Sequence, residues 1–502
     1  MSDKKFYVTT PIYYVNDKPH IGHAYTTILA DVLARYHKED GQETFFLTGL
    51  DEHGQKVQQA AEKRGMAPQE HCDDLAPRFI QLWKKLNIEN SDFIRTTEPR
   101  HKEVVQKILQ QVYDNGDIYS AEYEGWYSVS EERFITSTEK DSGEFRDIKQ
   151  LKEKNYFFRM GKYQQKLIDH INDNPDFICP ESRKNEILGF LRQPLGDLCV
   201  SRPKDRLNWG IELSFDKDYV TYVWFDALIN YISAIGYLSD DAKFKKWWPH
   251  SLHLIGKDIL TTHSVYWTTM LFSLGLPLPK KIFAHGWWLI GESKMSKSLG
   301  NVVSPLDLVD EYGVDAVRYY LMSQMVLGQD CSFTFESFIT RFNNDLANDF
   351  GNLLNRVSGL IRKNFDGVVP ACGQLSDADK EIVDLTGQTE KEIACAVDKL
   401  EIHTAVASTL RLVSMANKYL EHQAPWKVAK EDLKRAGTIL YVATEALRIA
   451  TLHLVPIMPS KTKVVLDVLR AVGSDTKWGG LRSGSVLEAH DALFPRLELS
   501  KE

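Results

Sequence analysis

The first fifty residues carry the pattern of a strand, a helix and a second strand. Residues 6–9 are a run of aromatic and β-branched side chains, which is typical of a buried strand. Apolar residues between 28 and 36 recur at helical spacing, and residues 44–48 form a second strand-like run. Two strands joined through a helix pair in parallel, with a right-handed crossover. The stretch therefore predicts an α/β fold whose parallel sheet binds ligands at the carboxyl ends of its strands.

Two histidines, His20 and His23, lie where the first strand leads into the helix. A helix N-terminus presents unbonded backbone N–H groups and a positive dipole end, which suit a phosphate. Gly22 lets a ligand approach the backbone, and the imidazoles add donors whose charge changes near neutral pH. Loop histidines without a function are the alternative when this motif is considered alone.

A second polar motif covers residues 291–300, which are bounded by glycines and include Lys294 and Lys297. We expect a surface loop that presents two phosphate-seeking cations. A solvated turn without a ligand is the alternative. The common nucleotide motifs are missing, because the sequence has no GxGxxG and no P-loop.

Composition excludes several classes of protein. Of the 502 residues 43% are hydrophobic and 26% charged, as in ordinary globular proteins. The net charge of −8 gives no overall basic field of the kind that binds nucleic acid. Composition does not exclude a local basic patch. No apolar run approaches the roughly 20 residues of a membrane span, and no leader peptide is expected. The six cysteines are scattered, which favours a reducing compartment and offers no zinc framework.

The patterns divide the chain into five segments. We expect the two halves of the sheet domain in residues 1–117 and 219–300, separated by a small β-rich insertion in residues 118–218. A linking region follows in residues 301–342, and residues 343–502 carry the stripes of an all-helical bundle. Within these segments, residues 54–115 read as helices, residues 118–160 as short strands and turns, and about the last thirty residues as a tail.

The histidine motif followed far downstream by the lysine motif, on an α/β sheet, resembles the signature pair of the class I aminoacyl-tRNA synthetases. Five flanking stretches narrow the resemblance to the methionyl branch of that family: residues 9–16, 51–54, 223–227, 255–258 and 423–426. The resemblance implies a Rossmann-like catalytic domain and a helical anticodon-binding domain. It also implies activation of L-methionine by ATP with Mg²⁺, then transfer to tRNA(Met), by a cytoplasmic monomer.

The resemblance assigns roles residue by residue. Asp51 would pair with the α-ammonium group of methionine. The methionine pocket would be walled by Ile12, Tyr14, Trp224, Ala227, Leu228, Tyr231, Ile259 and His263, with Tyr231 offering its hydroxyl to the sulfur and Trp267 stacked behind. ATP would be bound by His20, Gly22, His23, Gly256, Asp258, Lys294 and Lys297, and Arg202 would join the phosphate-binding residues or form a structural salt bridge.

In the helical segment, Asn352, Arg356 and Trp426 match the family's anticodon-reading positions. Unpaired bases stack on aromatic rings and are read at their edges, so these residue types suit the role. Residues 126–155 contain no cysteine, whereas many relatives carry zinc knuckles there, so we expect no structural zinc. A catalytically inactive module that binds tRNA or nucleotide on the same fold is the alternative function.

Overall fold

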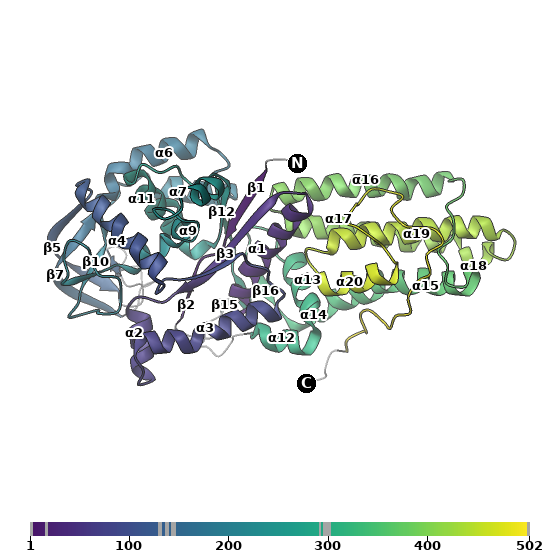
Figure 1. Ribbon diagram of the computed structural model, residues 1–502, viewed down its shortest axis with the longest axis horizontal. Helices are drawn as coiled ribbons and strands as arrows, with labels where there is room; N and C mark the ends of the chain where they lie inside the picture. Colours follow the sequence, from purple (N-terminus) through teal and green to yellow (C-terminus); the bar gives the residue numbers. More distant parts are fainter. Residues whose placement is uncertain are drawn as a thin grey trace. The chain divides into compact units, whose positions relative to one another are not determined.

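The computed structural model describes residues 4–15, 19–128, 133–135, 140–141, 147–290, 293–294 and 303–498 (Figure 1). The chain forms two compact units. The first consists of Met1–Pro19, Gly41–Lys84 and Glu89–His285, and the second of His20–Asp40, Lys85–Ile88 and Gly286–Glu502. The five segments expected from the sequence remain a prediction. The boundaries of the two compact units do not coincide with the boundaries of these segments.

A seven-stranded parallel sheet forms the centre of the first unit, which confirms the predicted α/β fold. Its order is β2 (Tyr13–Tyr14), β3 (Glu43–Asp51), β1 (Lys5–Thr9), β12 (Ser251–Gly256), β13 (Lys281–His285) and β8 (Ile178–Cys179), with β4 (Asp92–Arg95) also paired to β3. Five of the six residues of β12 are buried, as expected for a central parallel strand covered on both faces.

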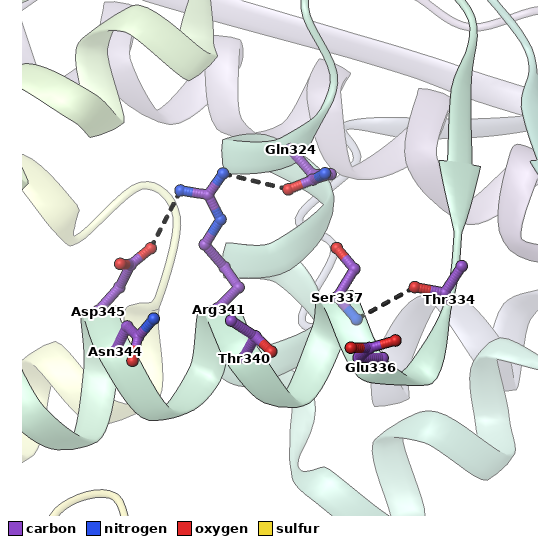
Figure 2. Close-up of a pocket in the computed structure, with 8 residues that line it drawn as sticks. All are labelled: Gln324, Thr334, Glu336, Ser337, Thr340, Arg341, Asn344 and Asp345. Atoms are coloured by element: carbon purple, nitrogen blue, oxygen red, sulfur yellow. Dashed lines mark hydrogen bonds and ion pairs between the residues drawn. The ribbon is translucent and has the colours of Figure 1, made fainter.

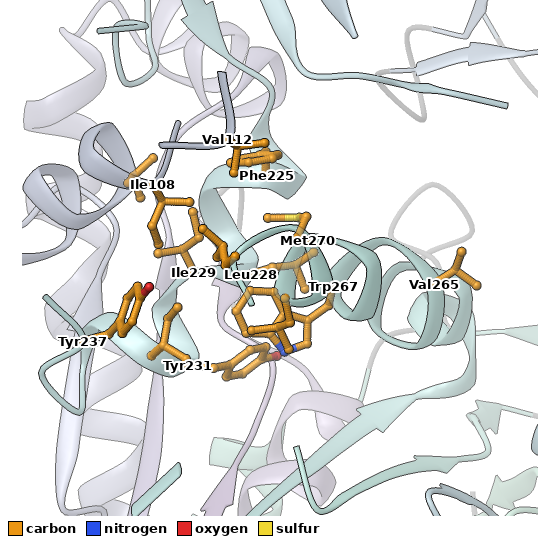
Figure 3. Close-up of a cluster of buried hydrophobic side chains, with 14 of the residues drawn as sticks. Ile108, Val112, Phe225, Leu228, Ile229, Tyr231, Tyr237, Val265, Trp267 and Met270 are labelled. Carbon is orange, nitrogen blue, oxygen red and sulfur yellow. The ribbon is translucent and has the colours of Figure 1, made fainter. Parts of the chain in front are cut away.

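Helices of the first unit connect these strands. They are α2 (Gln55–Lys63), α3 (Pro68–Lys85), α4 (Pro99–Asp114), α6 (Gln164–Asp173), α7 (Glu181–Phe190), α8 (Val223–Leu228), α9 (Asn230–Ser233), α10 (Asp241–Trp247) and α11 (Thr268–Ser273). Shorter helical turns lie at Met160–Tyr163, Trp248–His250 and Lys257–Ile259, and a π-helix covers Thr262–Trp267. Figure 3 shows part of the core that α8, α9, α11 and the π-helix share with α4.

The β-rich insertion contains an antiparallel sheet of β6 (Arg133–Ile135), β5 (Ile118–Ser128), β7 (Ile148–Phe158) and β9 (Leu198–Cys199). The expectation of short strands was wrong here, because β5 and β7 are 11 residues each and pair along their whole length. Charged residues on the solvent side of β7 interrupt its apolar pattern, which hid the strand's length. A small ribbon of β10 (Ser201–Pro203) and β11 (Tyr219–Thr221) follows.

Two further strands were missed because they are short. β4 lies inside the stretch expected to be helical, and only one of its four residues is buried, so it has no periodic signal. β8 has two residues and comes from the expected insertion, yet it pairs with β13 of the main sheet. This short strand of the expected insertion therefore belongs to the main sheet.

The second unit is mainly helical, which confirms the predicted bundle. It begins with α1 (Ile21–Glu39) and continues with α12 (Pro305–Tyr312), α13 (Val314–Gln324), α14 (Phe335–Arg341), a π-helix (Phe342–Gly351), α15 (Asn352–Phe365), α16 (Asp377–Asp398), α17 (Ile402–Gln423), α18 (Pro425–Val428), α19 (Leu433–Leu454) and α20 (Pro459–Val468). The strands β14 (Trp288–Ile290), β15 (Ser293–Lys294) and β16 (Cys331–Phe333) form a small sheet. Every residue of α19 from Ala436 to Leu454 is buried, so α19 is the axis on which α15, α16 and α17 pack.

Helix α1 is held in the second unit by a buried arginine. Arg318 of α13 donates to Asp31 of α1 at 2.6 Å and to the carbonyls of Leu86, Pro456 and Ile457 at 2.8–2.9 Å. The guanidinium is fully buried and the Asp31 side chain nearly so. One side chain therefore ties α1 to three other segments of this unit.

Residues 470–498 are packed, so the expectation of a tail was wrong for this part of the chain. Residues 470–498 form no helix or strand among those described, but Leu481, Leu487 and Phe494 are buried. The buried carboxylate of Glu445 accepts hydrogen bonds from the backbone N–H groups of residues 479–481. Side-chain burial and backbone hydrogen bonds, rather than regular structure, hold this segment.

Candidate active site

Four of the predicted ligand-binding residues lie at the carboxyl edge of the parallel sheet. Asp51 is the last residue of β3, and Tyr14 is its direct neighbour on β2. Gly256 ends β12, and Asp258 lies in the helical turn that follows. A Cβ atom at Gly256 would come within 2.5 Å of an Asp258 carboxylate oxygen, so a larger residue here would displace the Asp258 side chain. The edge is where ligands of such sheets bind.

Tyr231 and His263 form a buried hydrogen bond of 2.7 Å beside this edge. The Nδ1 atom of His263 contacts the Ile259 carbonyl at 2.9 Å, and a carbonyl only accepts, so Nδ1 carries the proton. Nε2 is then the acceptor, and the Tyr231 hydroxyl donates to it. Burial outweighs the Ile259 hydrogen bond and lowers the pKa of His263 to about 4, so the ring is neutral at pH 7. The Tyr231 hydroxyl, which was expected to face a thioether, thus donates its proton to His263 in this structure.

A second buried histidine lies under the Tyr231 ring. His253 stacks on Tyr231 with ring centroids 4.1 Å apart, and burial lowers the pKa of His253 well below its usual value. Its Nε2 accepts from the indole N–H of Trp267 at 3.2 Å, and its Nδ1 lies 2.8 Å from the Thr9 hydroxyl. The base of this region is therefore aromatic and uncharged, which suits an apolar, polarizable ligand group.

The other predicted pocket residues differ in how deeply their side chains are buried. Ile12, Trp224 and Ile259 are partly buried and pack against the core of the first unit. Ala227 and Leu228 of α8 are almost fully buried, and Figure 3 shows Leu228 within the core cluster to which Trp267 and Tyr231 also belong. Leu228, Tyr231 and Trp267 therefore belong to one hydrophobic core, and Ile12, Tyr14, Trp224 and Ile259 pack against it.

In the second unit, His20 and His23 cap helix α1. The Gly22 backbone N–H donates to Nδ1 of His20 at 3.1 Å, and the His20 N–H donates to Nδ1 of His23 at 3.3 Å. Since both Nδ1 atoms accept, each neutral ring carries its proton on Nε2. The rings stack with centroids 3.8 Å apart, and the first turn of α1 contains no acidic residue to offset the helix dipole. This is a helix N-terminus with two aligned imidazole donors.

The other residues predicted to bind phosphate are Lys294, Lys297 and Arg202. The backbone of Lys294 in β15 pairs with Leu289 of β14, whereas Lys297 lies outside the described residues. Arg202 is buried, with its guanidinium carbon 4.5 Å from the centre of the Tyr222 ring. It donates to the carbonyl of Ser201 at 2.7 Å.

The three predicted anticodon residues lie together in the helical unit. Asn352 and Arg356 are one turn apart on α15, and the Arg356 guanidinium lies 5.9 Å from the ring centre of Trp426, which is 38% exposed. Arg356 donates to the carbonyl and the side-chain oxygen of Asn417 at 3.1 and 3.2 Å. Asn352 contacts the same side-chain oxygen at 3.4 Å. The group presents an exposed aromatic ring beside a fixed guanidinium.

Figure 2 shows a polar pocket of about 470 Å³ elsewhere in the same unit. It is lined by Gln324, Thr334, Glu336, Ser337, Thr340, Arg341, Asn344 and Asp345. Among these eight described residues Arg341 is the only cation, and it is bound by Gln324 and Asp345. The pocket is therefore rich in hydroxyl and amide groups and slightly acidic.

Within the described part of the chain, no three His, Cys, Asp or Glu side chains are grouped so as to hold a metal ion. None of the described helices has the length and apolar character needed to cross a membrane.

Three functional candidates were missed by sequence reasoning. His253 and Asn417 lie outside the recognised motifs. Asp226 lies inside one, but its two histidine partners are 125 and 173 residues away, so no local spacing links them. Only the folded sheet and helices bring these groups together.

Comparisons with known proteins agree over almost the whole chain. The family model "tRNA synthetases class I (M)" matches residues 6–144 and 142–358, and "Anticodon binding domain of methionyl tRNA ligase" matches residues 369–497. A methionine–tRNA ligase of Caldanaerobacter subterraneus subsp. tengcongensis is 45% identical over 511 residues, covering 99% of this chain and 80% of that protein. That of Bacillus subtilis is 44% identical over 526 residues, covering 99% and 78%.

Solved structures agree as well. The Mycobacterium tuberculosis methionyl-tRNA synthetase in complex with methionyl-adenylate has a TM-score of 0.94 and 39% identity, covering 98% of this chain and 100% of that one. The apo form of the same enzyme has a TM-score of 0.87 and 36% identity.

Proposed function

The chain belongs to the methionyl-tRNA synthetases of class I, and on that premise we propose which of its residues carry out each part of the reaction. The reaction is ATP-dependent activation of methionine to methionyl-adenylate, followed by transfer of the methionyl group to tRNA(Met). The inactive binding module considered above has no support in these comparisons.

The neutral aromatic cluster around Tyr231 is the observation that carries the proposal for methionine. His253 and His263 are both held neutral by burial, so the pocket base offers polarizable surface without charge to the side chain of the substrate. The Tyr231 hydroxyl, which His263 orients, contacts the sulfur. Asp51, at the end of β3, binds the α-ammonium group through a charge-assisted hydrogen bond.

The pocket walls complete methionine binding in this proposal. Ile12, Tyr14, Trp224 and Ile259 are partly buried, as expected for surfaces that a ligand covers. Ala227 and Leu228 close the pocket from α8, and Trp267 supports Tyr231 from behind, with ring centroids 6.0 Å apart.

For ATP, we propose that Gly256 and Asp258 contact the ribose and that Gly22, His20 and His23 bind the nucleotide. The Nε2–H groups of both imidazoles donate to phosphate oxygens as the α-phosphate is attacked by the methionine carboxylate and pyrophosphate leaves. Such preorganised donors stabilise developing charge without a covalent nucleophile.

Lysine and arginine side chains complete phosphate binding in this proposal. Lys294 and Lys297 supply positive charge to the leaving pyrophosphate, and Arg202 joins them. Mg²⁺ enters as part of the ATP substrate, bound by its phosphate oxygens, and neutralises their charge. No structural zinc is proposed.

For tRNA(Met), we propose that an anticodon base stacks on Trp426 while Arg356 and Asn352 read base edges. The exposure of the indole and the two hydrogen bonds from Arg356 to Asn417 support this assignment. We also propose that the chain acts as a cytoplasmic monomer, which light scattering after size exclusion tests for the oligomeric state.

The amino-acid dependence of pyrophosphate–ATP exchange tests the proposal. We expect exchange with L-methionine and with none of the other standard amino acids at equal concentration. Exchange driven by a different amino acid would refute the substrate assignment.

Lys297→Ala tests the lysine motif. We expect this variant to lose exchange activity while it binds methionine in calorimetry as the parent chain does. Unchanged exchange in the Lys297→Ala variant would contradict the role given to this motif.

A further inference from the structure

Asp226 of α8 is a buried carboxylate held by two histidines from different elements. Its Oδ2 lies 2.6 Å from Nδ1 of His53, and its Oδ1 lies 2.7 Å from Nε2 of His101. All three side chains are at most 3% exposed. Burial favours the neutral acid, but His53 and His101 outweigh it and lower the pKa of Asp226 to about 2. At neutral pH the carboxylate is therefore ionised, and each of its oxygens accepts one N–H bond.

The three residues join the elements that bind methionine. His53 lies two residues after Asp51, the proposed ligand of the α-ammonium group. Asp226 lies on α8 between Trp224 and Ala227, two proposed walls of the pocket. The network therefore connects the group that binds one end of methionine with the helix that encloses the other end.

The third residue of the network, His101, extends it to helices α4 and α9. His101 lies in the first turn of α4, and its Nδ1 is 2.8 Å from the hydroxyl of Ser233 on α9. Two residues before Ser233 is Tyr231, the proposed contact of the methionine sulfur. His101 thus links Asp226 to the helix that carries the key tyrosine.

Backbone N–H groups on both sides of His53 are also hydrogen-bonded. The Glu52 N–H donates to the Thr96 hydroxyl at 3.0 Å, and the Gly54 N–H donates to the Trp209 carbonyl at 3.2 Å. The side-chain bond from His53 to Asp226 joins the loop around His53 directly to α8. Its loss would change the distance between Asp51 and the pocket wall without removing a substrate contact.

We propose that Asp226 is a positioning residue for methionine, which fixes the spacing between the α-ammonium ligand Asp51 and the side-chain pocket through His53 and His101. The inference rests on the function proposed above. It differs from that function because Asp226, His53 and His101 are assigned no contact with methionine, ATP or tRNA.

Asp226→Asn in the full chain tests the inference by steady-state pyrophosphate–ATP exchange. Asparagine keeps the shape but offers one acceptor oxygen, so one histidine loses its bond. We expect the KM for methionine to rise about 10-fold or more, the effect of losing a hydrogen bond to a charged group. The KM for ATP should stay within about twofold, since no ATP-binding residue contacts the network.

Asp117→Asn is the matched control. Asp117 is also a buried carboxylate of the first unit, and it accepts hydrogen bonds from Lys162, Tyr163 and Ser273, none of which is assigned to methionine. We expect this variant to lower thermal stability but to leave the KM for methionine unchanged. An equal rise in the KM for methionine in both variants would show a general structural effect and overturn the inference.

His101→Gln provides a milder second variant, because glutamine can still donate to Asp226. We expect a smaller rise in the KM for methionine than in Asp226→Asn, with melting temperature near that of the parent chain. A KM for methionine unchanged in His101→Gln, or in a folded Asp226→Asn, overturns the inference. Failure of the parent chain to exchange with methionine would refute the proposed function instead.

Discussion

Asn417 offers the sharpest prediction for the anticodon-binding residues. It is 8% exposed on α17, and its side-chain oxygen accepts from Arg356 at 3.2 Å and from Asn352 at 3.4 Å. Its side-chain amide donates to the Asp349 carbonyl at 3.0 Å, which fixes the orientation of the group. Asn417 therefore aligns two proposed base-reading side chains without being exposed to a base itself.

The magnitude follows from what Asn417→Ala removes. The backbone carbonyl of residue 417 still accepts from Arg356 at 3.1 Å, so one of the two bonds to the guanidinium survives. The lost bond involves a charged donor and is worth about 1.5–3 kcal/mol. We expect kcat/KM for tRNA(Met) in aminoacylation to fall about 10- to 150-fold.

Two measurements on the same preparation separate this effect from misfolding. Methionine-dependent pyrophosphate–ATP exchange needs no tRNA, so Asn417→Ala should leave its rate unchanged. Met415→Ala on the same helix, at a residue that is 39% exposed, serves as the control and should alter neither activity. An Asn417→Ala variant that aminoacylates tRNA(Met) at the parental rate would refute the reasoning.

Two further predictions concern stability. Arg318→Met leaves Asp31 and three carbonyls without the buried guanidinium, at a cost of about 3–5 kcal/mol, so calorimetry should show a melting temperature lower by about 10 °C. Lys85→Met breaks an exposed pair with Asp310 and should change the melting temperature little. Equal shifts in the two variants would contradict the role given to Arg318. His263 binds fewer protons folded than unfolded, because burial lowers its pKa to about 4 from 6.5. Its stabilising contribution is therefore complete above pH 6.5 and is lost as the pH falls toward 4. The melting temperature should fall over this range and fall less steeply in His263→Gln; parallel profiles would exclude His263 as the cause.

Local patterns were sufficient to predict the sheet core and the helix capped by His20 and His23. Both signals come from adjacent residues: a run of strand formers, then polar groups at a helix start. β8 could not be predicted, because two residues carry no periodicity and only pairing with β13 makes them a strand. Sequence patterns therefore identify helices and strands that have a periodic signal of their own. They miss strands such as β8, which form only by pairing with another strand.

The candidate site shows the same division. The resemblance placed Tyr231 and His263 in one pocket, but which atom donates to which depends on the Ile259 carbonyl, a backbone group with no sequence signature. His253 was missed because its stacking on Tyr231 depends on where β12 lies beside α9. Proton positions and ring stacking are properties of the fold, and sequence reasoning alone did not supply them.

The attachment of α1 has a consequence for how this polypeptide can be divided. The Tyr36 hydroxyl donates to the His453 carbonyl at 2.8 Å, and Arg318 joins Asp31 to the carbonyls of Pro456 and Ile457. A truncated fragment ending soon after β13 would contain both signature histidines but none of these anchors for their helix. The N-terminal signature is therefore inseparable from residues more than 400 positions later, as the 417-residue separation of Tyr36 and His453 illustrates. Adjacent in sequence to the sheet, the histidine helix is an integral component of the helical unit.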